Sequence, residues 1–158
     1  MELKYTLIFL LGFLSCAFLF YGFSYSNVEI PFATGLVSFA ANAPNDWVSD
    51  DDIIVFDDMI LLRIENATLS SYADSGSMKP VFDEGANGIR VVPGSEDEIE
   101  VGDIVSYRFD KMLIVHRVVE KGVDDEGVYF VMKGDNNLIV DEKVRFGQIE
   151  YVTVGVIW

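Results

Sequence analysis

An apolar run near the N-terminus constrains this chain more than any other feature. Residues 5–23 are apolar almost without interruption, and a helix of that length would reach roughly 28 Å at about 1.5 Å per residue. That is long enough to cross a bilayer. Lys4 precedes the run and no Lys or Arg follows before Arg63, so the positive-inside bias predicts a cytoplasmic N-terminus. We expect residues 1–25 to form a single-pass transmembrane anchor, with the rest of the chain outside the cytoplasm.

Two other interpretations of this segment stay open. A cleaved signal peptide has a shorter apolar core and ends in a small-x-small sequence, which residues 23–26 match poorly. The triplet Leu14-Ser15-Cys16 resembles a lipoprotein cleavage site, but the apolar run continues beyond it. Cys16 is the only cysteine of the chain, so the fold does not depend on an internal disulfide.

Residues 26–58 are interpreted as a juxtamembrane and linker segment. Phe32, Leu36 and Phe39 recur at helical spacing within an apolar stretch at residues 28–43. This face could lie on the membrane surface or pack on the protein's own domain. The acidic stretch that follows, at residues 46–58, is interrupted by the apolar residues 53–56, which could form a short edge strand or a linker turn.

From Met59 onward the pattern is that of a mainly β, compact antiparallel domain covering residues 59–158. Runs of β-branched and aromatic residues are separated by Gly, Pro, Asn and Asp, which is typical of strands joined by turns. Residues 121–127 are interpreted as the loop of a hairpin. Strands are expected at residues 60–64, 88–92, 103–109, 112–119, 128–133 and 149–157.

Charge and composition exclude several classes of function. The formal net charge is −15 and no long Lys/Arg run is present, which argues against a nucleic-acid partner because phosphate binding needs clustered positive charge. The acidic residues 95–98 lack the ordered spacing of a calcium loop. We therefore expect no metal and no cofactor.

One serine and one histidine are the candidates for chemistry. Ser77 lies in a Gly-containing turn, in the sequence Asp-Ser-Gly-Ser-Met-Lys-Pro at residues 74–80, and His116 is the only histidine. A serine hydroxyl becomes a nucleophile when a base removes its proton, and imidazole can do so near neutral pH. On a strand, Ile114, His116 and Val118 would share one face. Each feature alone is usually structural, so their combination carries the hypothesis.

Four sequence blocks follow one another in a fixed order. They are residues 74–80, 101–105 (Val-Gly-Asp-Ile-Val), 113–119 (Leu-Ile-Val-His-Arg-Val-Val) and 133–137 (Lys-Gly-Asp-Asn-Asn), the last followed by Asp141. The second block is also interpreted as a turn into a strand, with Asp103 at the surface or in the turn. Together the blocks resemble type I signal peptidase, specifically the archaeal and endoplasmic-reticulum branch, in which histidine replaces a lysine general base. The resemblance covers roughly residues 70–145 and implies a β catalytic domain of the signal peptidase type.

The resemblance implies a role for each site residue. Ser77 matches the nucleophile and His116 the general base. Asp135 is our first choice for the carboxylate that orients the imidazole, and Asp141 is a supporting site residue. The backbone N–H of Ser77 and the hydroxyl of Ser75 would stabilise the oxyanion. Gly76 would permit the turn, and Met78 would shape the substrate site.

The implied activity is the removal of signal peptides from exported precursors by a membrane-bound serine endopeptidase. The expected partners are those signal peptides, membrane lipid and the protein-export channel, and Val81 and Phe82 are expected to face the lipid. Two rival hypotheses remain. The chain could be a membrane-anchored binding or accessory protein with an inactive peptidase fold, or a specialised protease that cuts a narrow set of exported proteins or itself.

Overall fold

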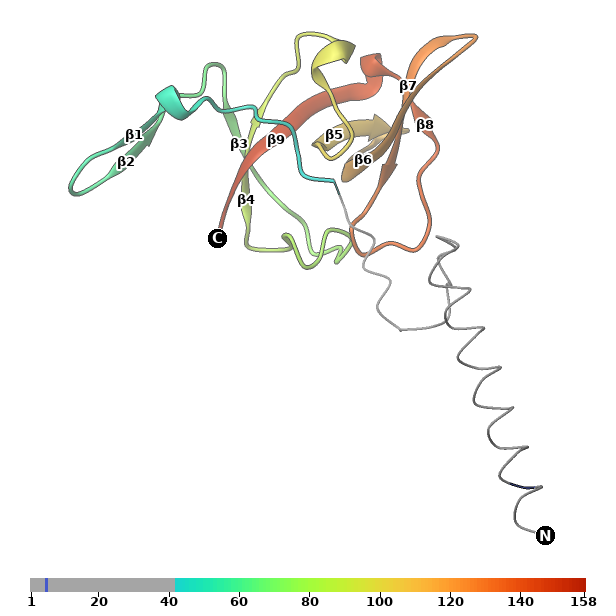
Figure 1. Cartoon of the computed structure of the whole chain (residues 1–158), viewed down its shortest axis with the longest axis horizontal. Helices are drawn as coiled ribbons and strands as arrows, with labels where there is room; N and C mark the ends of the chain where they lie inside the picture. Colours follow the sequence, from blue (N-terminus) through green and yellow to red (C-terminus); the bar gives the residue numbers. More distant parts are fainter. Residues whose placement is uncertain (1–4, 6–41) are drawn as a thin grey trace. The chain divides into compact units, whose positions relative to one another are not determined.

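The computed structural model describes residue 5 and residues 42–158, and from residue 42 onward these belong to one compact unit (Figure 1). The expected anchor and the apolar stretch before residue 42 lie outside the described residues. Within the described part, no helix is both long enough and apolar enough to cross a membrane.

A seven-stranded antiparallel sheet forms the centre of this unit, which confirms the mainly β, antiparallel class. Its strand order is β3-β4-β9-β5-β6-β7-β8. A separate two-stranded sheet pairs β1 (Ile53–Val55) with β2 (Ile60–Leu62). The strands of the large sheet are β3 (Thr68–Ser71), β4 (Asn87–Val91), β5 (Ile104–Phe109), β6 (Met112–Asp124), β7 (Gly127–Lys133), β8 (Lys143–Val144) and β9 (Ile149–Ile157). The described helices are 3-10 turns at Asp50–Asp52, Glu96–Glu98 and Phe146–Gln148.

Most predicted strands are found, with two differences. β4, β5, β7 and β9 begin and end within one residue of the predicted bounds. The strand predicted at residues 60–64 is shorter, and it pairs with β1 instead of joining the large sheet. β3 and β8 were not predicted, because each is short and has little alternation of apolar and polar residues.

The predicted hairpin is confirmed, but its loop is shorter than residues 121–127, because β6 continues to Asp124. Asp124 pairs with Gly127, so the turn contains only Asp125 and Glu126. Gly122 looks like a loop residue but lies in the strand, opposite Tyr129. A Cβ atom at Gly122 would stand 2.5 Å from the Tyr129 ring. The glycine therefore makes room for an aromatic ring across the strand.

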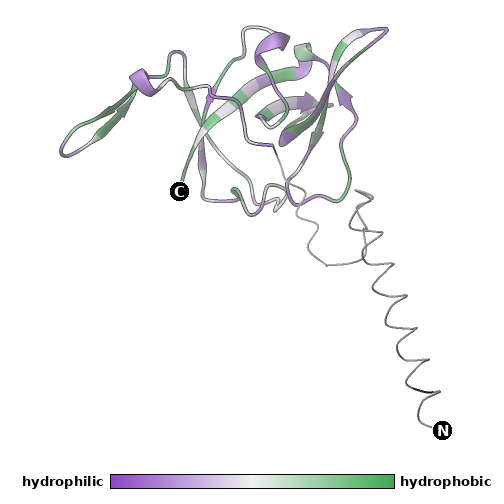
Figure 2. Cartoon of the chain, viewed as in Figure 1, coloured by the Kyte–Doolittle hydropathy of each residue, from purple (hydrophilic) through white to green (hydrophobic). Residues whose placement is uncertain are grey.

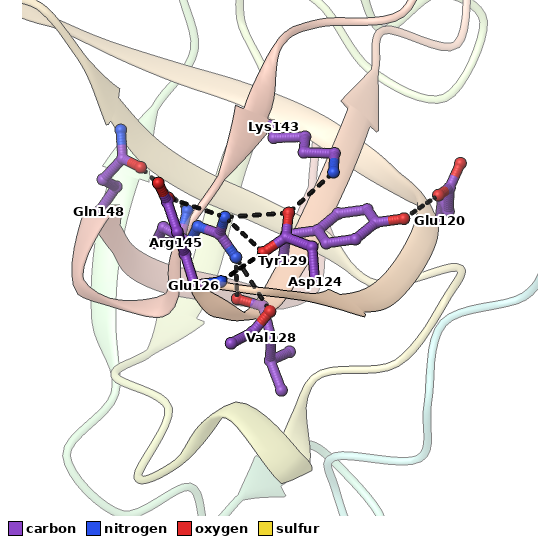
Figure 3. Close-up of polar contacts among 9 residues, drawn as sticks. Glu120, Asp124, Glu126, Val128, Tyr129, Lys143, Arg145 and Gln148 are labelled. Carbon is purple, nitrogen blue, oxygen red and sulfur yellow. Dashed lines mark hydrogen bonds and ion pairs between the residues drawn. The ribbon is translucent and has the colours of Figure 1, made fainter.

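The acidic residue Asp124 at this end of the hairpin is paired with two basic side chains (Figure 3). The Asp124 carboxylate accepts hydrogen bonds from Lys143 Nζ at 2.8 Å and from Arg145 Nη2 at 2.8 and 3.0 Å. The Lys143 ammonium also lies 3.8 Å from the centre of the Tyr129 ring. These contacts join the end of β6 to β8 and to the residue after it.

Hydrophobic residues alternate with polar ones along the strands (Figure 2), and the two faces of the sheet carry separate core clusters. On β5, Val105 and Tyr107 belong to the larger cluster and Ile104 belongs to the smaller one. On β6, Val118 packs in the larger cluster and Val115 against the smaller. The predicted alternation of the strand that carries His116 is confirmed.

Candidate active site

The turn that carries Ser77 follows β3 and is fixed by its neighbours on both sides. Gly76 has φ +66°, a left-handed conformation that glycine adopts without strain, and its N–H donates to Asp83 Oδ1 at 3.0 Å. Met78 is buried in the smaller core cluster. Ser77 is thus held between a constrained glycine and an anchored apolar side chain.

Phe82, which was expected to face lipid, is buried in the same cluster. Its ring stacks on Tyr72 with the centroids 4.0 Å apart. The expectation failed because the residues after Ser77 turn inward to pack against the sheet. This packing holds the turn that carries Ser77 against the core of the domain.

Ser75 and Ser77 are in direct contact. Their hydroxyl oxygens lie 3.1 Å apart, and the Ser77 backbone N–H donates to Ser75 Oγ at 3.4 Å. The two groups that we expected at an oxyanion, the Ser75 hydroxyl and the Ser77 amide, therefore converge beside the Ser77 hydroxyl. In the structure they bond to each other.

A second loop, residues 134–137, is hydrogen-bonded to the turn that carries Ser77. The Asn136 backbone N–H donates to the Ser77 carbonyl oxygen at 2.8 Å, and Asn136 Nδ2 donates to the Gly76 carbonyl oxygen at 3.0 Å. A Cβ atom at Gly134 would stand 2.7 Å from the Ser77 carbonyl oxygen. Only a residue without a side chain permits this approach.

His116 is nearly buried on β6, and its carboxylate partner is Asp141. The distance from His116 Nδ1 to Asp141 Oδ2 is 2.6 Å. The Tyr107 hydroxyl donates to the same Oδ2 atom at 2.8 Å. The Asp141 backbone N–H donates to the Met132 carbonyl oxygen at 2.8 Å, which ties the residue to the end of β7. Tyr107 was not identified from the sequence, although it lies two positions from Val105, the residue paired with His116.

The first choice of Asp135 as the carboxylate at His116 is corrected by this geometry. Asp135 forms a bidentate ion pair with Arg117, with Nε–Oδ1 and Nη2–Oδ2 distances of 2.8 Å. The side chains of Arg117 and Asp135 are only 7% and 9% exposed. Arg117 follows His116 on β6 and so points to the opposite face of the strand. A carboxylate bound to Arg117 is therefore on the wrong side to reach His116.

Ser77 and His116 line the same cleft, a cavity of about 450 Å³. No hydrogen bond of the described part joins their side chains directly. The two side chains that the sequence singled out as candidates for chemistry therefore share one cleft.

Two strand edges meet at this cleft. β3 pairs only with β4 among the described strands, and residues 112–116 of β6 pair only with β5. Residues 70–71 of β3 and 113–116 of β6 both line the cleft. Backbone groups on these edges are thus available to an extended peptide.

A serine turn and a carboxylate-bound histidine that line one cleft are the groups that a serine hydrolase requires. The comparisons with known proteins point to one kind of hydrolase, a peptidase. Over 80 residues the chain is 41% identical to the signal peptidase complex catalytic subunit SEC11 of Candida tropicalis and 31% identical to that of Yarrowia lipolytica. The SEC11 subunit of Candida albicans is 39% identical over the same length. The resemblance to the endoplasmic-reticulum branch of type I signal peptidases is confirmed.

The similarity is partial in extent. Each of the three matches covers 49% of this chain and between 45% and 47% of the relative. The chain spans about half the length of the curated relatives it matches. No family model and no solved structure matches the chain.

Proposed function

We propose that this chain is a membrane-bound serine endopeptidase that removes signal peptides from exported precursor proteins. The observation that carries the proposal is that His116, whose Nδ1 contacts Asp141, lines the same cleft as Ser77. The similarity of half the chain to catalytic subunits of the signal peptidase complex supports the same activity. In this proposal Ser77 is the nucleophile, His116 the general base and Asp141 the orienting acid.

The contact at Nδ1 decides how His116 would act. A carboxylate accepts hydrogen bonds, so the proton of a neutral imidazole resides on Nδ1 and the lone pair on Nε2. Nε2 takes the proton of the Ser77 hydroxyl while Oγ bonds to the scissile carbonyl carbon. The C–N bond then breaks as His116 returns that proton to the leaving amine. Water, deprotonated by His116, hydrolyses the acyl-enzyme and releases the new carboxylate and Ser77.

The oxyanion of each tetrahedral intermediate would be stabilised beside Ser77. The Ser75 hydroxyl and the Ser77 backbone N–H lie together there, and both can donate to a substrate oxygen. Substrate would replace the bond that these groups make with each other. Met78, which is buried in the smaller core cluster, would hold Ser77 in position.

The substrate would bind as an extended strand between the free edges of β3 and β6. Tyr72, Met78 and Phe82 line the cleft near Ser77, and these large side chains leave room for small residues before the cut. We further propose that residues 5–23 anchor the enzyme in the membrane, with the N-terminus cytoplasmic. Lipid and the export channel are then its neighbours.

Cleavage of a secretory precursor by the detergent-solubilised full chain tests the proposal. Wild type should cut after a small-x-small sequence, identified by product mass, and Ser77→Ala should lose nearly all activity. Ser95→Ala is the matched control, because the Ser95 side chain makes no capping hydrogen bond, and it should cut like wild type. Equal cleavage by Ser77→Ala and wild type would contradict the proposal. Absence of cleavage by wild type across several precursors would favour an accessory protein or a narrower protease.

A further inference from the structure

Asp141, the carboxylate at His116, lies in a largely exposed segment that is weakly attached to the sheet. The three residues before it, Leu138, Ile139 and Val140, are 94%, 78% and 51% exposed. Its backbone is tied to β7 by one hydrogen bond, to Met132. A carboxylate in such a segment can rotate and exchange its two oxygens, unless a fixed group holds one of them.

Tyr107 is that fixed group. Its side chain is 1% exposed and belongs to the larger core cluster, together with Val105 and Val118. Its hydroxyl donates at 2.8 Å to Oδ2, the same oxygen that His116 Nδ1 approaches at 2.6 Å. Among the described residues, Oδ1 of Asp141 has no hydrogen-bond partner. Both contacts thus select one oxygen of the carboxylate.

We propose that Tyr107 is a positioning residue of this active site, which acts through Asp141 by holding Oδ2 at His116 Nδ1. The inference rests on the proposed function, in which His116 is the base. Tyr107 is fixed in the core of the sheet, and its hydrogen bond fixes the Asp141 carboxylate in turn. Because Oδ2 then stays at Nδ1, the imidazole keeps its proton on that nitrogen. Burial and the bond to Asp141 raise the pKa of the Tyr107 phenol, which therefore remains a donor at every pH where the enzyme would work.

The chain provides a matched control for this role. Tyr129 on β7 also donates its hydroxyl to a carboxylate, that of Glu120, at 2.7 Å (Figure 3). That pair lies on the β6–β7 hairpin and does not line the cleft. Tyr129→Phe therefore removes the same chemical group from the same sheet without touching Asp141.

The kinetic test compares Tyr107→Phe with Tyr129→Phe in the full chain. A hydrogen bond to a charged group is stronger than one between neutral groups, so kcat of Tyr107→Phe should fall by about tenfold or more, with KM nearly unchanged. Tyr129→Phe should match wild type. In an Asp141→Asn background the Tyr107→Phe change should add less than about twofold, because both changes break one unit. A tenfold additional loss in that background would overturn the proposal.

A spectroscopic test does not depend on activity. His116 is the only histidine of the chain, so its ring N–H resonances are identified without further assignment. The Nδ1–H resonance should shift and broaden in Tyr107→Phe and stay in place in Tyr129→Phe. An unchanged resonance in Tyr107→Phe would overturn the inference. If wild type and Ser77→Ala were both inactive, the proposed function would fail while this resonance still decided the role of Tyr107.

Discussion

At the scale of single residues, Gly134 shows how closely the site is assembled. It stands where a Cβ atom would be 2.7 Å from the Ser77 carbonyl oxygen and 2.8 Å from the Asn137 side chain. The contact with Ser77 is a backbone contact, so relief of the clash requires movement of the turn that carries Ser77. Displacements of about 1 Å in an active site can reduce rates about a hundredfold.

Gly134→Ala should therefore lower cleavage activity by about a hundredfold while leaving the sheet folded. Precursor cleavage and circular dichroism measure the two effects. Gly147→Ala is the control, because a Cβ atom at Gly147 would meet nothing within 4 Å. Wild-type activity in Gly134→Ala would show that the loop of residues 134–137 does not set the position of Ser77.

The sequence was sufficient to propose Ser77 and His116 as candidates, which line one cleft, but not to predict whether Asp135 or Asp141 contacts His116. Both aspartates follow β7 in one short loop, and their distances from His116 depend on how that loop folds. The alternation of β6 contained a usable signal: Arg117 must face away from His116 and needs a buried anion. Asp135 meets that need, which leaves Asp141 for the histidine.

At the scale of elements, the β6–β7 hairpin is stabilised at its end by charge. The hydrogen bonds from Lys143 and from Arg145 hold the pKa of the Asp124 carboxyl well below its usual range. The folded protein therefore binds fewer protons at Asp124 than the unfolded chain. The stability from this carboxylate is present above about pH 4, the pKa of an unfolded Asp, and is lost as the pH falls towards the lower folded value.

Asp124→Asn should lower Tm by a few degrees at pH 7, because Lys143 and Arg145 lose their shared anion. The difference from wild type should narrow as the pH drops below about 4. Thermal unfolding of both proteins across this range measures it. Asp125→Asn, in the exposed turn beside it, should unfold like wild type at pH 7. A Tm difference that stayed constant down to pH 2 would contradict the assignment.

Hairpin boundaries were the weakest part of the sequence prediction, for reasons visible in this element. Gly122, Asp124 and Asp125 suggested a loop because these residue types favour turns. Contacts with other strands override that preference: Tyr129 lies across the hairpin from Gly122, and Lys143 and Arg145 pair with Asp124. Lys143 and Arg145 are 19 and 21 residues further along the chain, so the local sequence around Asp124 does not contain them.

At the scale of the whole molecule, the β1–β2 sheet is independent of the large one. Its strands pair only with each other, and neither core cluster contains a residue from it. Its apolar side chains are exposed apart from half-buried Ile54, and Val55 and Ile60 are exposed most of all. Residues 53–62 thus contribute no buried apolar surface to the centre of the domain.

Replacement of residues 53–62 by a short Gly/Ser linker should leave the seven-stranded sheet intact. Because no buried contact is lost, Tm should change by no more than about 2 °C, and Ser77-dependent cleavage of a soluble precursor should persist. Thermal unfolding and product mass spectrometry measure these outcomes. Loss of cooperative unfolding would show that the small sheet is part of the folding unit.

Asp103, expected at the surface or in a turn, is fully buried and directly precedes β5. Its carboxylate accepts hydrogen bonds from the Asn45 backbone N–H and Trp47 Nε1, at 2.8 and 3.1 Å. Arg117 adds a bond to the Asn42 carbonyl oxygen. These contacts attach residues 42–47 to β5 and β6 in the middle of the sheet. A pulling force applied to the domain through its N-terminal end would therefore act first on the buried groups of Asp103 and Arg117, and not on the turn that carries Ser77.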